Sequence, residues 1–268
     1  MKLDERMKQY EYVTRNYLTC RTPVIIRLDG RAFHTFTRGM KKPFDTILVD
    51  AMQETMKQLC ENIPNCKFGY VQSDEISLVL LDTNNTETQA WFNNNLSKIL
   101  SISASMATLY FNKAFENFLS NKLITDENFN SLSYEQKLGT AMFDSRAFNL
   151  PIEEINNYFI WRQQDCIRNS IQMVAQANFS HKELQNLNCK QLIEKLKQKN
   201  IDYENDFPIY LKRGTCCYKK YTSYNHTEEK ENGYRYTQII NRNIWIIDEQ
   251  MPNLIEDKFF IREKMLND

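Results

Sequence analysis

Apolar and polar residues follow two periods along the first 150 residues, and the switches between them predict the order of elements. Short runs rich in β-branched and aromatic residues are typical of strands, whereas apolar residues three and four positions apart indicate helices. One apolar run folds back as a hairpin, with Ser73, Asp74 and Glu75 near its tip. The predicted elements are a helix at 4–20, a strand at 24–30, a helix at 45–61, a hairpin at 69–80, a helix at 87–119 and a strand at 141–148.

This order predicts an α+β fold, a palm-like or ferredoxin-like antiparallel sheet with helices on one face. We assign this fold to residues 1–150 as one domain. After Pro151 the pattern becomes mainly helical up to residue 199, with two capping boxes, and strands are expected at 207–221 and 234–248. Residues 151–268 are therefore expected to form a helical and β-hairpin region.

Acidic side chains mark the ends of the two predicted strand units. Asp29 ends the first, and Asp74 and Glu75 lie at the tip of the hairpin. If the two units are neighbours in one sheet, the three carboxylates converge and offer hard oxygen ligands, which suit Mg²⁺ and phosphate-bearing substrates. The alternative is that they are ordinary solvated acids at strand ends. Strict alternation points Glu75 to the opposite face from Asp74, where it either orients a neighbour or is solvated.

A basic loop follows the first strand. Residues 31–43 carry five basic side chains and no acid. With the glycines at 30 and 39, this composition suits an anion cradle, and we predict phosphate contacts from His34 and Lys42. Ser73 either donates a hydrogen bond to a nucleotide or only helps to form its turn. A solvated loop is the alternative interpretation.

Cationic side chains in the second region are candidates for RNA binding. Lys212 and Arg213 occur among tyrosines, a mixture that suits unpaired RNA ends, and a solvated strand pair is the alternative. His181 and Lys182 lie in the first turn of a predicted helix, which favours phosphate. Trp161 and Tyr158 are expected in the core. The predicted RNA contacts are Arg162, Asn169, His181, Lys182, Lys212 and Arg213.

Composition excludes several classes of protein. Lys plus Arg and Asp plus Glu both number 34, so a nucleic-acid partner requires a local basic patch. Seven cysteines without a CxxC pair argue against a zinc site and favour a reducing compartment. No apolar run reaches the length of a membrane span, and the charged start does not suit a secretory signal. We expect a soluble intracellular protein without a membrane partner, cytoplasmic or alternatively mitochondrial.

Taken together, these motifs resemble the tRNA(His) guanylyltransferase family and its Thg-like relatives, the 3′-to-5′ nucleotide polymerases. None of the motifs is specific alone, but they occur in the order of the family over most of residues 1–220. The matching stretches are Arg27-Leu28-Asp29-Gly30-Arg31-Ala32-Phe33-His34, Lys42-Pro43-x-Asp45, Gln72-Ser73-Asp74-Glu75, Phe143-Asp144-Ser145-Arg146, Trp161-Arg162-Gln163-x-Asp165-Cys166 and Arg213-Gly214-Thr215.

The resemblance implies that residues 1–150 are the palm-like catalytic domain of a nucleotidyltransferase, with two Mg²⁺ ions held by Asp29, Asp74 and the backbone carbonyl of Gly30. It implies that tRNA is the substrate together with ATP and GTP or other nucleoside triphosphates, and that the chain forms a homotetramer. The second region would then contribute to RNA binding and oligomerisation. The residues implied to bind nucleotide are Gly30, Arg31, Ala32, Phe33, His34, Lys42 and Ser73.

One departure from the family's motifs favours one branch of the family over the other. The branch dedicated to histidine tRNA continues after Asp-Cys with His-Ile-Asn-Asn-Leu-Tyr-Asn, whereas residues 167–173 here keep only Asn169 of that run. The sequence therefore resembles the branch that rebuilds truncated tRNA, by template-directed addition to the 5′ end after ATP-dependent activation. The alternative is untemplated G−1 addition to tRNA(His). A nucleotide cyclase and a non-catalytic tRNA-binding protein are the further alternatives.

Overall fold

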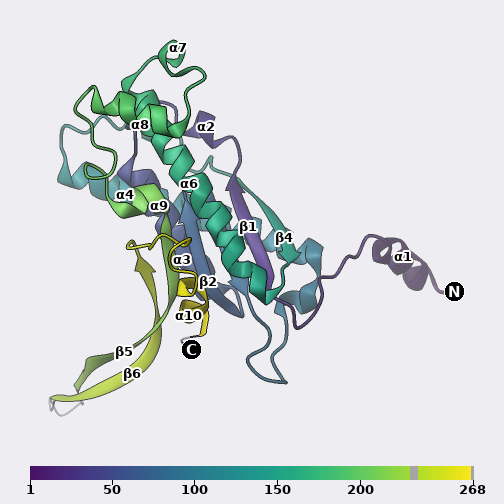
Figure 1. The fold of residues 1–268 in the computed structure, drawn as a ribbon. Helices are drawn as coiled ribbons and strands as arrows, with labels where there is room; N and C mark the ends of the chain where they lie inside the picture. Colours follow the sequence, from purple (N-terminus) through teal and green to yellow (C-terminus); the bar gives the residue numbers. More distant parts are fainter. Residues whose placement is uncertain (230–234, 267–268) are drawn as a thin grey trace.

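A computed structural model describes residues 1–229 and 235–266. Its centre is a six-stranded antiparallel sheet in the order β4-β1-β3-β2-β5-β6 (Figure 1). The predicted strand and hairpin are neighbours, because β1 pairs with β3. The strands are β1 (Val24–Gly30), β2 (Cys66–Gln72), β3 (Glu75–Leu80), β4 (Phe143–Asn149), β5 (Thr215–Glu229) and β6 (Arg235–Asp248).

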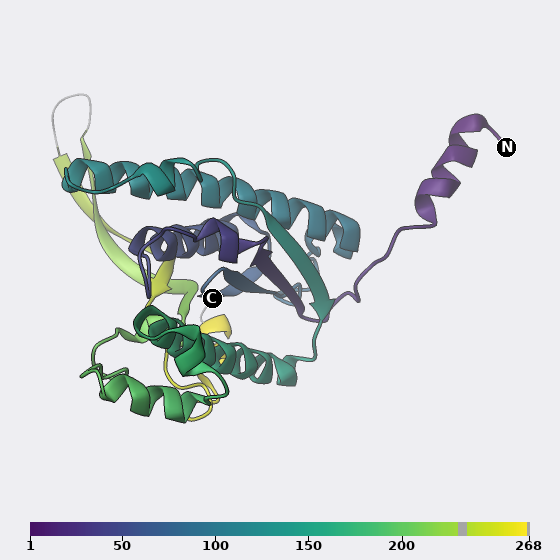
Figure 2. The ribbon, with the colours of Figure 1, turned by 90° about the horizontal axis from the view of Figure 1, so that it is seen from above.

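Helices cover both faces of this sheet. Figure 2 shows α3 and α4 on one side of it, and α6 with α8 on the other. The antiparallel sheet and its covering helices confirm the predicted palm-like α+β class. The helices are α1 (Leu3–Tyr12), α2 (Phe33–Phe36), α3 (Thr46–Asn62), α4 (Leu96–Thr125), α5 (Leu132–Glu135), α6 (Ile155–Asn178), α7 (His181–Leu184), α8 (Cys189–Lys197), α9 (Ile209–Arg213) and α10 (Phe260–Leu266), with 3₁₀ turns at Trp91–Asn94 and Ile152–Glu154.

Strand alternation divides β1 between two cores, and this division places the acidic end of the strand. Ile26 and Leu28 are fully buried in the core formed with α3 and α4. Ile25 is fully buried in the core formed with α6 and α10. Because alternate side chains point to the same face, Arg27 and Asp29 share the face of Ile25. The polar end of β1 therefore lies on the side of the sheet that α6 covers.

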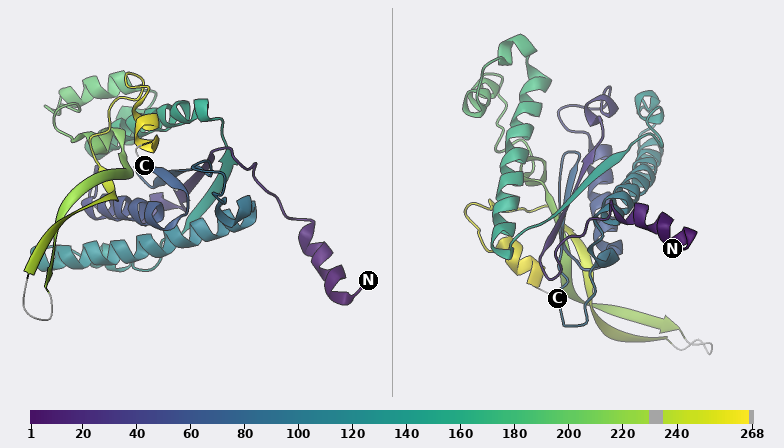
Figure 3. Two further views of the ribbon diagram at one scale, coloured as in Figure 1. Left: turned by 90° about the horizontal axis from the view of Figure 1, so that it is seen from below. Right: turned by 90° about the vertical axis from the view of Figure 1, so that its right-hand side faces the viewer.

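Several element boundaries differ from the prediction. The first helix ends at Tyr12 instead of residue 20, and α1 has no buried residue and stands apart from the body of the molecule (Figure 3). The helix predicted at 87–119 begins at Leu96, after a kinked 3₁₀ turn, and continues to Thr125. The first strand of the C-terminal hairpin starts at Thr215, because 209–213 is helical, and it continues beyond its predicted end at residue 221 to Glu229. Residues 230–234, which include the first residue of the second predicted strand, lie outside the described part of the chain.

Both predicted regions contribute strands to the same sheet. β5, from residues beyond 150, pairs with β2 through partners such as Gly69 and Cys217. The division at residue 150 stays a prediction, and the sheet runs across it without interruption. Among the described helices, none combines the length and apolarity that crossing a membrane would require.

Candidate active site

The predicted acidic residues meet at one end of β1, β3 and β4. Asp29 lies opposite Glu75 of β3 on one side and opposite Asp144 of β4 on the other. Asp74 lies in the two-residue turn between β2 and β3, and its carbonyl accepts a hydrogen bond from the Gly30 N–H at 3.0 Å. The end of β1 is thus tied to the tip of the hairpin, and Asp29 lies close enough to Asp74 to affect its pKa. The expected convergence holds for these two acids only, because Glu75 pairs with Arg162 instead.

Burial and neighbouring charges both act on the pKa of Asp29 and Asp74. Burial raises the pKa of Asp29 and the negative charge of Asp144 raises it further, while nearby arginines of β1, β4 and α6 lower it in part. Burial also raises the pKa of Asp74, and the charge of Asp29 raises it further. The Ser73 hydroxyl opposes this shift, because it donates a hydrogen bond to Asp74 Oδ1 at 3.0 Å. Two half-buried carboxylates that repel one another favour a bound cation.

The donors present fit a hard divalent cation. Carboxylate and carbonyl oxygens are the ligands that Mg²⁺ takes in proteins, and Asp29, Asp74 and the Gly30 carbonyl supply both kinds. Within the described residues there is no metal-binding cluster of three His, Cys, Asp or Glu side chains. A cation at this end of the sheet would therefore depend on the backbone carbonyl, as the resemblance implied.

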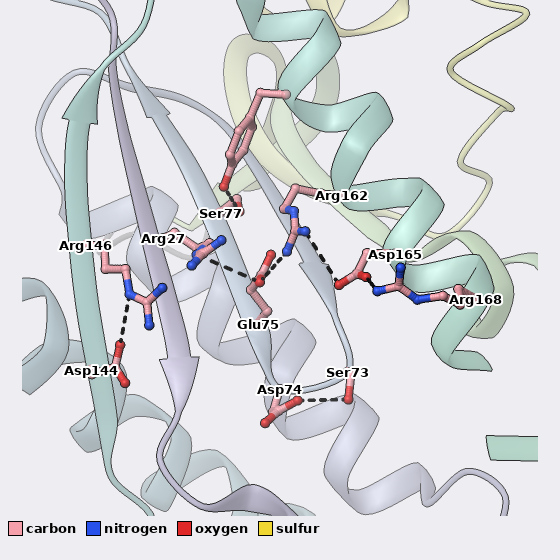
Figure 4. Close-up of polar contacts among 11 residues, drawn as sticks. Arg27, Ser73, Asp74, Glu75, Ser77, Asp144, Arg146, Arg162, Asp165 and Arg168 are labelled. Atoms are coloured by element: carbon pink, nitrogen blue, oxygen red, sulfur yellow. Dashed lines mark hydrogen bonds and ion pairs between the residues drawn. The ribbon is translucent and has the colours of Figure 1, made fainter. Parts of the chain in front are cut away.

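Glu75 takes a different role from Asp29 and Asp74. Its Oε2 lies 2.7 Å from Arg162 Nη1 and 3.9 Å from Arg27 Nε. Figure 4 shows Glu75 directed toward α6 and away from Asp74. Burial raises the pKa of Glu75, and the charge of Arg162 opposes this shift. Of the two alternatives from the sequence, the ion pair supports a carboxylate that orients a neighbour. The sequence also made Glu75 a candidate catalytic residue beside Asp29 and Asp74, but Glu75 is held by Arg162 and does not line the cavity next to Asp74.

Two predicted RNA contacts are interior residues, and both predictions need correction. Arg162 is 5% exposed, pairs with Glu75 and Asp165, and stacks on the Trp161 ring at 3.6 Å. Lys212 is 7% exposed, and its Nζ lies 3.7 Å from a Glu204 carboxylate oxygen. Neither cation is presented to an RNA ligand in this conformation. Trp161, expected in the core, is half exposed, whereas the expected burial of Tyr158 is confirmed.

A cavity of about 430 Å³ adjoins Asp74. The cavity brings together four residues predicted to bind nucleotide, namely Phe33, His34, Lys42 and Ser73. Both His34 and Lys42 are exposed, so solvent and a ligand can reach them. The cavity is lined by Phe33, His34, Thr37, Met40, Lys41, Lys42, Pro43, Asp45, Leu48, Ser73, Asp74, Met173 and Gln176.

Local backbone geometry positions the walls of this cavity. A Cβ at Gly30 would lie 2.4 Å from Phe33 Cδ2, so only glycine lets the Phe33 ring pack under the end of β1. That ring stacks with Phe36 and meets Phe111 and Phe143 edge-on, which anchors α2. Ser73 has a φ of +49°, a conformation rare for residues other than glycine and common at functional turns.

The remaining predicted residues lie in separate places. Arg31 and Ala32 are exposed and are not among the residues that line the cavity. Asn169 lines a smaller neighbouring cavity of about 70 Å³ between α3 and α6. His181 and Lys182 are exposed at the start of α7, where the predicted capping box is present. The half-buried Arg213 offers its carbonyl to the Tyr70 hydroxyl at 2.7 Å. Of these residues, only Asn169 adjoins the large cavity, because the two cavities share Ser73 and Met173 in their walls.

Sequence reasoning missed residues that only the tertiary structure brings to the site. Met173 and Gln176 of α6 close one side of the cavity. No sequence signal identified them, because they lie about 100 residues from the hairpin tip. Arg27 could have been found from the sequence. It precedes Asp29 by two positions on a strand, and alternate strand residues share one face of the sheet. Lys41 was part of the predicted basic loop, and the structure places it in the cavity wall.

Comparisons with known proteins agree with this geometry and with the predicted family. The model of the tRNAHis guanylyltransferase family matches residues 4–151. A bacterial tRNA(His) guanylyltransferase (Thg1)-like protein in complex with ATP has a TM-score of 0.79 and 41% identity over 100% of both chains. A second structure with the same name, in complex with GTP, has a TM-score of 0.74 and 39% identity, covering 98% of this chain and 99% of that one. The tRNA(His) guanylyltransferase of Debaryomyces hansenii is 27% identical over 231 residues, 81% of this chain and 80% of its own. The chain belongs to the tRNA(His) guanylyltransferase family and is a nucleotidyltransferase.

Proposed function

We propose that the protein adds guanylate to the 5′ end of tRNA(His), in the 3′-to-5′ direction. The observation that carries this proposal is the cavity of about 430 Å³ beside Asp74, whose wall brings Lys41 and Lys42 to the acidic end of the hairpin. A triphosphate can lie in such a cavity with its phosphates at the acidic strand ends. Relatives solved with ATP and with GTP support nucleotides as the ligands of this cavity.

In the proposed reaction a 5′-monophosphate is first activated with ATP. The 3′-hydroxyl of the incoming GTP then attacks the activated phosphorus, a new phosphodiester bond forms, and AMP or pyrophosphate leaves. His34, Lys41 and Lys42 bind the phosphates of the nucleotide, and the Ser73 hydroxyl orients Asp74. Asp29, Asp74 and the Gly30 carbonyl would hold two Mg²⁺ ions. When bound, these ions supply charge neutralisation of the phosphates and a lower pKa for the attacking hydroxyl.

Template-directed repair of truncated tRNA is a second candidate function. The specific observation in its favour is the run at 167–173, which keeps only Asn169 of the motif from the histidine-tRNA branch. In the structure Asn169 lies on α6 beside the cavities, so this stretch is close to where an RNA end would meet the nucleotide. The names of the solved relatives favour guanylate addition, and the run at 167–173 favours repair.

Varying the template base separates the two candidates. A 5′-monophosphorylated tRNA lacking its first base is offered all four labelled nucleotides, with each of the four bases opposite the vacant position. Guanylate addition predicts labelled G whatever the opposite base, and best on tRNA(His). Repair predicts that the added base follows the template. Incorporation into no tRNA, with cyclic product from nucleotide alone, would contradict both and indicate a cyclase.

Removing one cation from the cavity should weaken nucleotide binding. We expect Lys42→Met to raise the KM for GTP about tenfold, because a charge-assisted phosphate contact contributes about 1.5–3 kcal/mol. The matched control is Lys190→Met, an exposed lysine of α8 outside the cavity lining. Steady-state kinetics with varied GTP measures both variants. An unchanged KM in Lys42→Met would show that Lys42 does not contact the phosphates.

A further inference from the structure

The cavity lysines, Lys41 and Lys42, lie on a loop whose conformation depends on hydrogen bonds from a few side chains. We call residues 37–45 the lysine loop; it links α2 to α3 at the end of the sheet toward which β1 points (Figure 1). At its far end Asp45 caps α3, because Oδ1 accepts the Leu48 N–H at 3.0 Å. The other oxygen, Oδ2, accepts the Lys41 N–H at 3.1 Å. Asp45 thus closes the part of the loop that presents Lys41 and Lys42.

A tyrosine from a distant part of the chain completes this arrangement. The Tyr134 hydroxyl donates to Asp45 Oδ2 at 2.6 Å and accepts the Lys41 N–H at 3.2 Å. One hydroxyl therefore bonds both the cap residue and the backbone of the first cavity lysine. Beside it, Ser133 Oγ donates to the Gly39 carbonyl at 3.1 Å, which holds a second point of the same loop.

The surroundings of Tyr134 make it a fixed support. Its side chain is 4% exposed, and its ring packs against Phe115 and Phe129. Burial, together with its hydrogen bond to Asp45, raises the pKa of Tyr134 to about 12, so the hydroxyl keeps the proton that it donates. Gly39 has a φ of +83°, and a Cβ there would lie 3.2 Å from Ser133 Cβ, so the loop follows α5 closely. Tyr134 itself does not line the cavity.

We propose that Tyr134 is a positioning residue for nucleotide binding, which acts by holding the lysine loop in the conformation that presents Lys41 and Lys42 to the phosphates. This inference rests on the proposed role of the cavity. Its physical basis is preorganisation: a loop already held in place loses less conformational entropy when the ligand binds. Without the hydroxyl, Asp45 Oδ2 loses its buried donor, and the Lys41 segment is free to take other conformations.

Tyr134→Phe isolates this effect because it removes the hydroxyl and keeps the ring. We expect its Kd for GTP and its KM for GTP to rise about tenfold, the scale of one lost hydrogen bond to a charged group, with kcat within about twofold of wild type. The matched control is Tyr203→Phe. That hydroxyl is also buried and is bonded to Ser170 Oγ at 2.5 Å, but it lies outside the cavity lining. Both variants remove a buried tyrosine hydroxyl and keep the ring, so an effect of general destabilisation would appear in both.

The measurement is GTP binding to the full chain, together with kinetics and thermal unfolding. Wild type that binds no GTP would reject the proposed function. Wild type that binds GTP, with Tyr134→Phe binding equally well or with Tyr203→Phe weakened as much, would reject the role of Tyr134. If Tyr134→Phe fails to fold, Ser133→Ala decides, since it releases only the bond to Gly39. We expect it to raise the Kd for GTP about threefold, and an unchanged Kd would overturn the proposal.

Discussion

Replacing Asp29 or Asp74 by asparagine is expected to abolish nucleotide transfer while the protein stays folded. Each substitution keeps the size of the side chain and removes the charge that a divalent cation requires. Because the proposed chemistry depends on cations for charge neutralisation, we expect a loss of at least about a thousandfold in kcat/KM. Incorporation of labelled nucleotide into tRNA measures the loss.

The same substitutions should not lower stability. Burial and like charge raise the pKa of both carboxyls, so their ionised forms destabilise the folded state once the pH exceeds the unfolded pKa. At pH 7 in EDTA, the Tm of each variant should equal or exceed that of wild type. Asp144→Asn is the control, since it removes an exposed acid opposite Asp29, and we expect it to stay active. Activity retained in Asp29→Asn would contradict the proposed site.

The largest loss of stability is expected from Arg162→Met. Arg162 is buried against Glu75, and removing one partner of a buried ion pair leaves the other charge without compensation, which costs about 3–5 kcal/mol. Arg27, at 3.9 Å from the same carboxylate, offsets part of this loss. Denaturant unfolding measures the free energy.

Two further variants test the cause of this loss. Arg168→Met removes an exposed arginine from the same helix, also paired with Asp165, and should change stability by at most about 1 kcal/mol. Arg162→Met combined with Glu75→Gln should be more stable than Arg162→Met alone, because no buried charge is stranded. If Arg162→Met unfolds like wild type but binds tRNA more weakly, then the original prediction of an RNA contact was right.

The part of the site that lies on strands could be predicted from the sequence. Asp29 stands at the end of a clear strand pattern, and Asp74 stands at the tip of a clear hairpin pattern. Antiparallel pairing of these two elements leaves few possible positions for the two acids. The basic loop could also be predicted, because residues 31–43 carry five basic side chains and no acid in a chain of zero net charge. These features are local in the sequence. The only further assumption needed to bring them together was that the first strand and the hairpin are neighbours in one sheet.

The face that α6 turns to the sheet could not be predicted. Helical spacing predicts that Trp161 is buried, and Arg162 was predicted to face RNA, whereas in the structure Trp161 is half exposed and Arg162 is buried. The reason is Glu75: a half-buried carboxylate on β3 needs a cation from the covering helix, and that need outweighs burial of the indole. Arg162 and Glu75 are 87 positions apart in the sequence, and Tyr134 and Asp45 are 89 positions apart. No local sequence pattern indicates contacts over such separations.

The most direct test of the proposed activity is protection of a radiolabelled 5′-phosphate on tRNA(His) from phosphatase. The RNA, lacking G−1 and carrying a labelled 5′-monophosphate, is incubated with the protein, ATP, GTP and Mg²⁺ and then treated with phosphatase. Addition of a nucleotide turns the label into an internal phosphodiester. We predict a resistant product one nucleotide longer that requires GTP and is absent with Asp29→Asn. Label that phosphatase removes completely, from this tRNA and from 5′-truncated tRNAs, would contradict nucleotide transfer to the 5′ end.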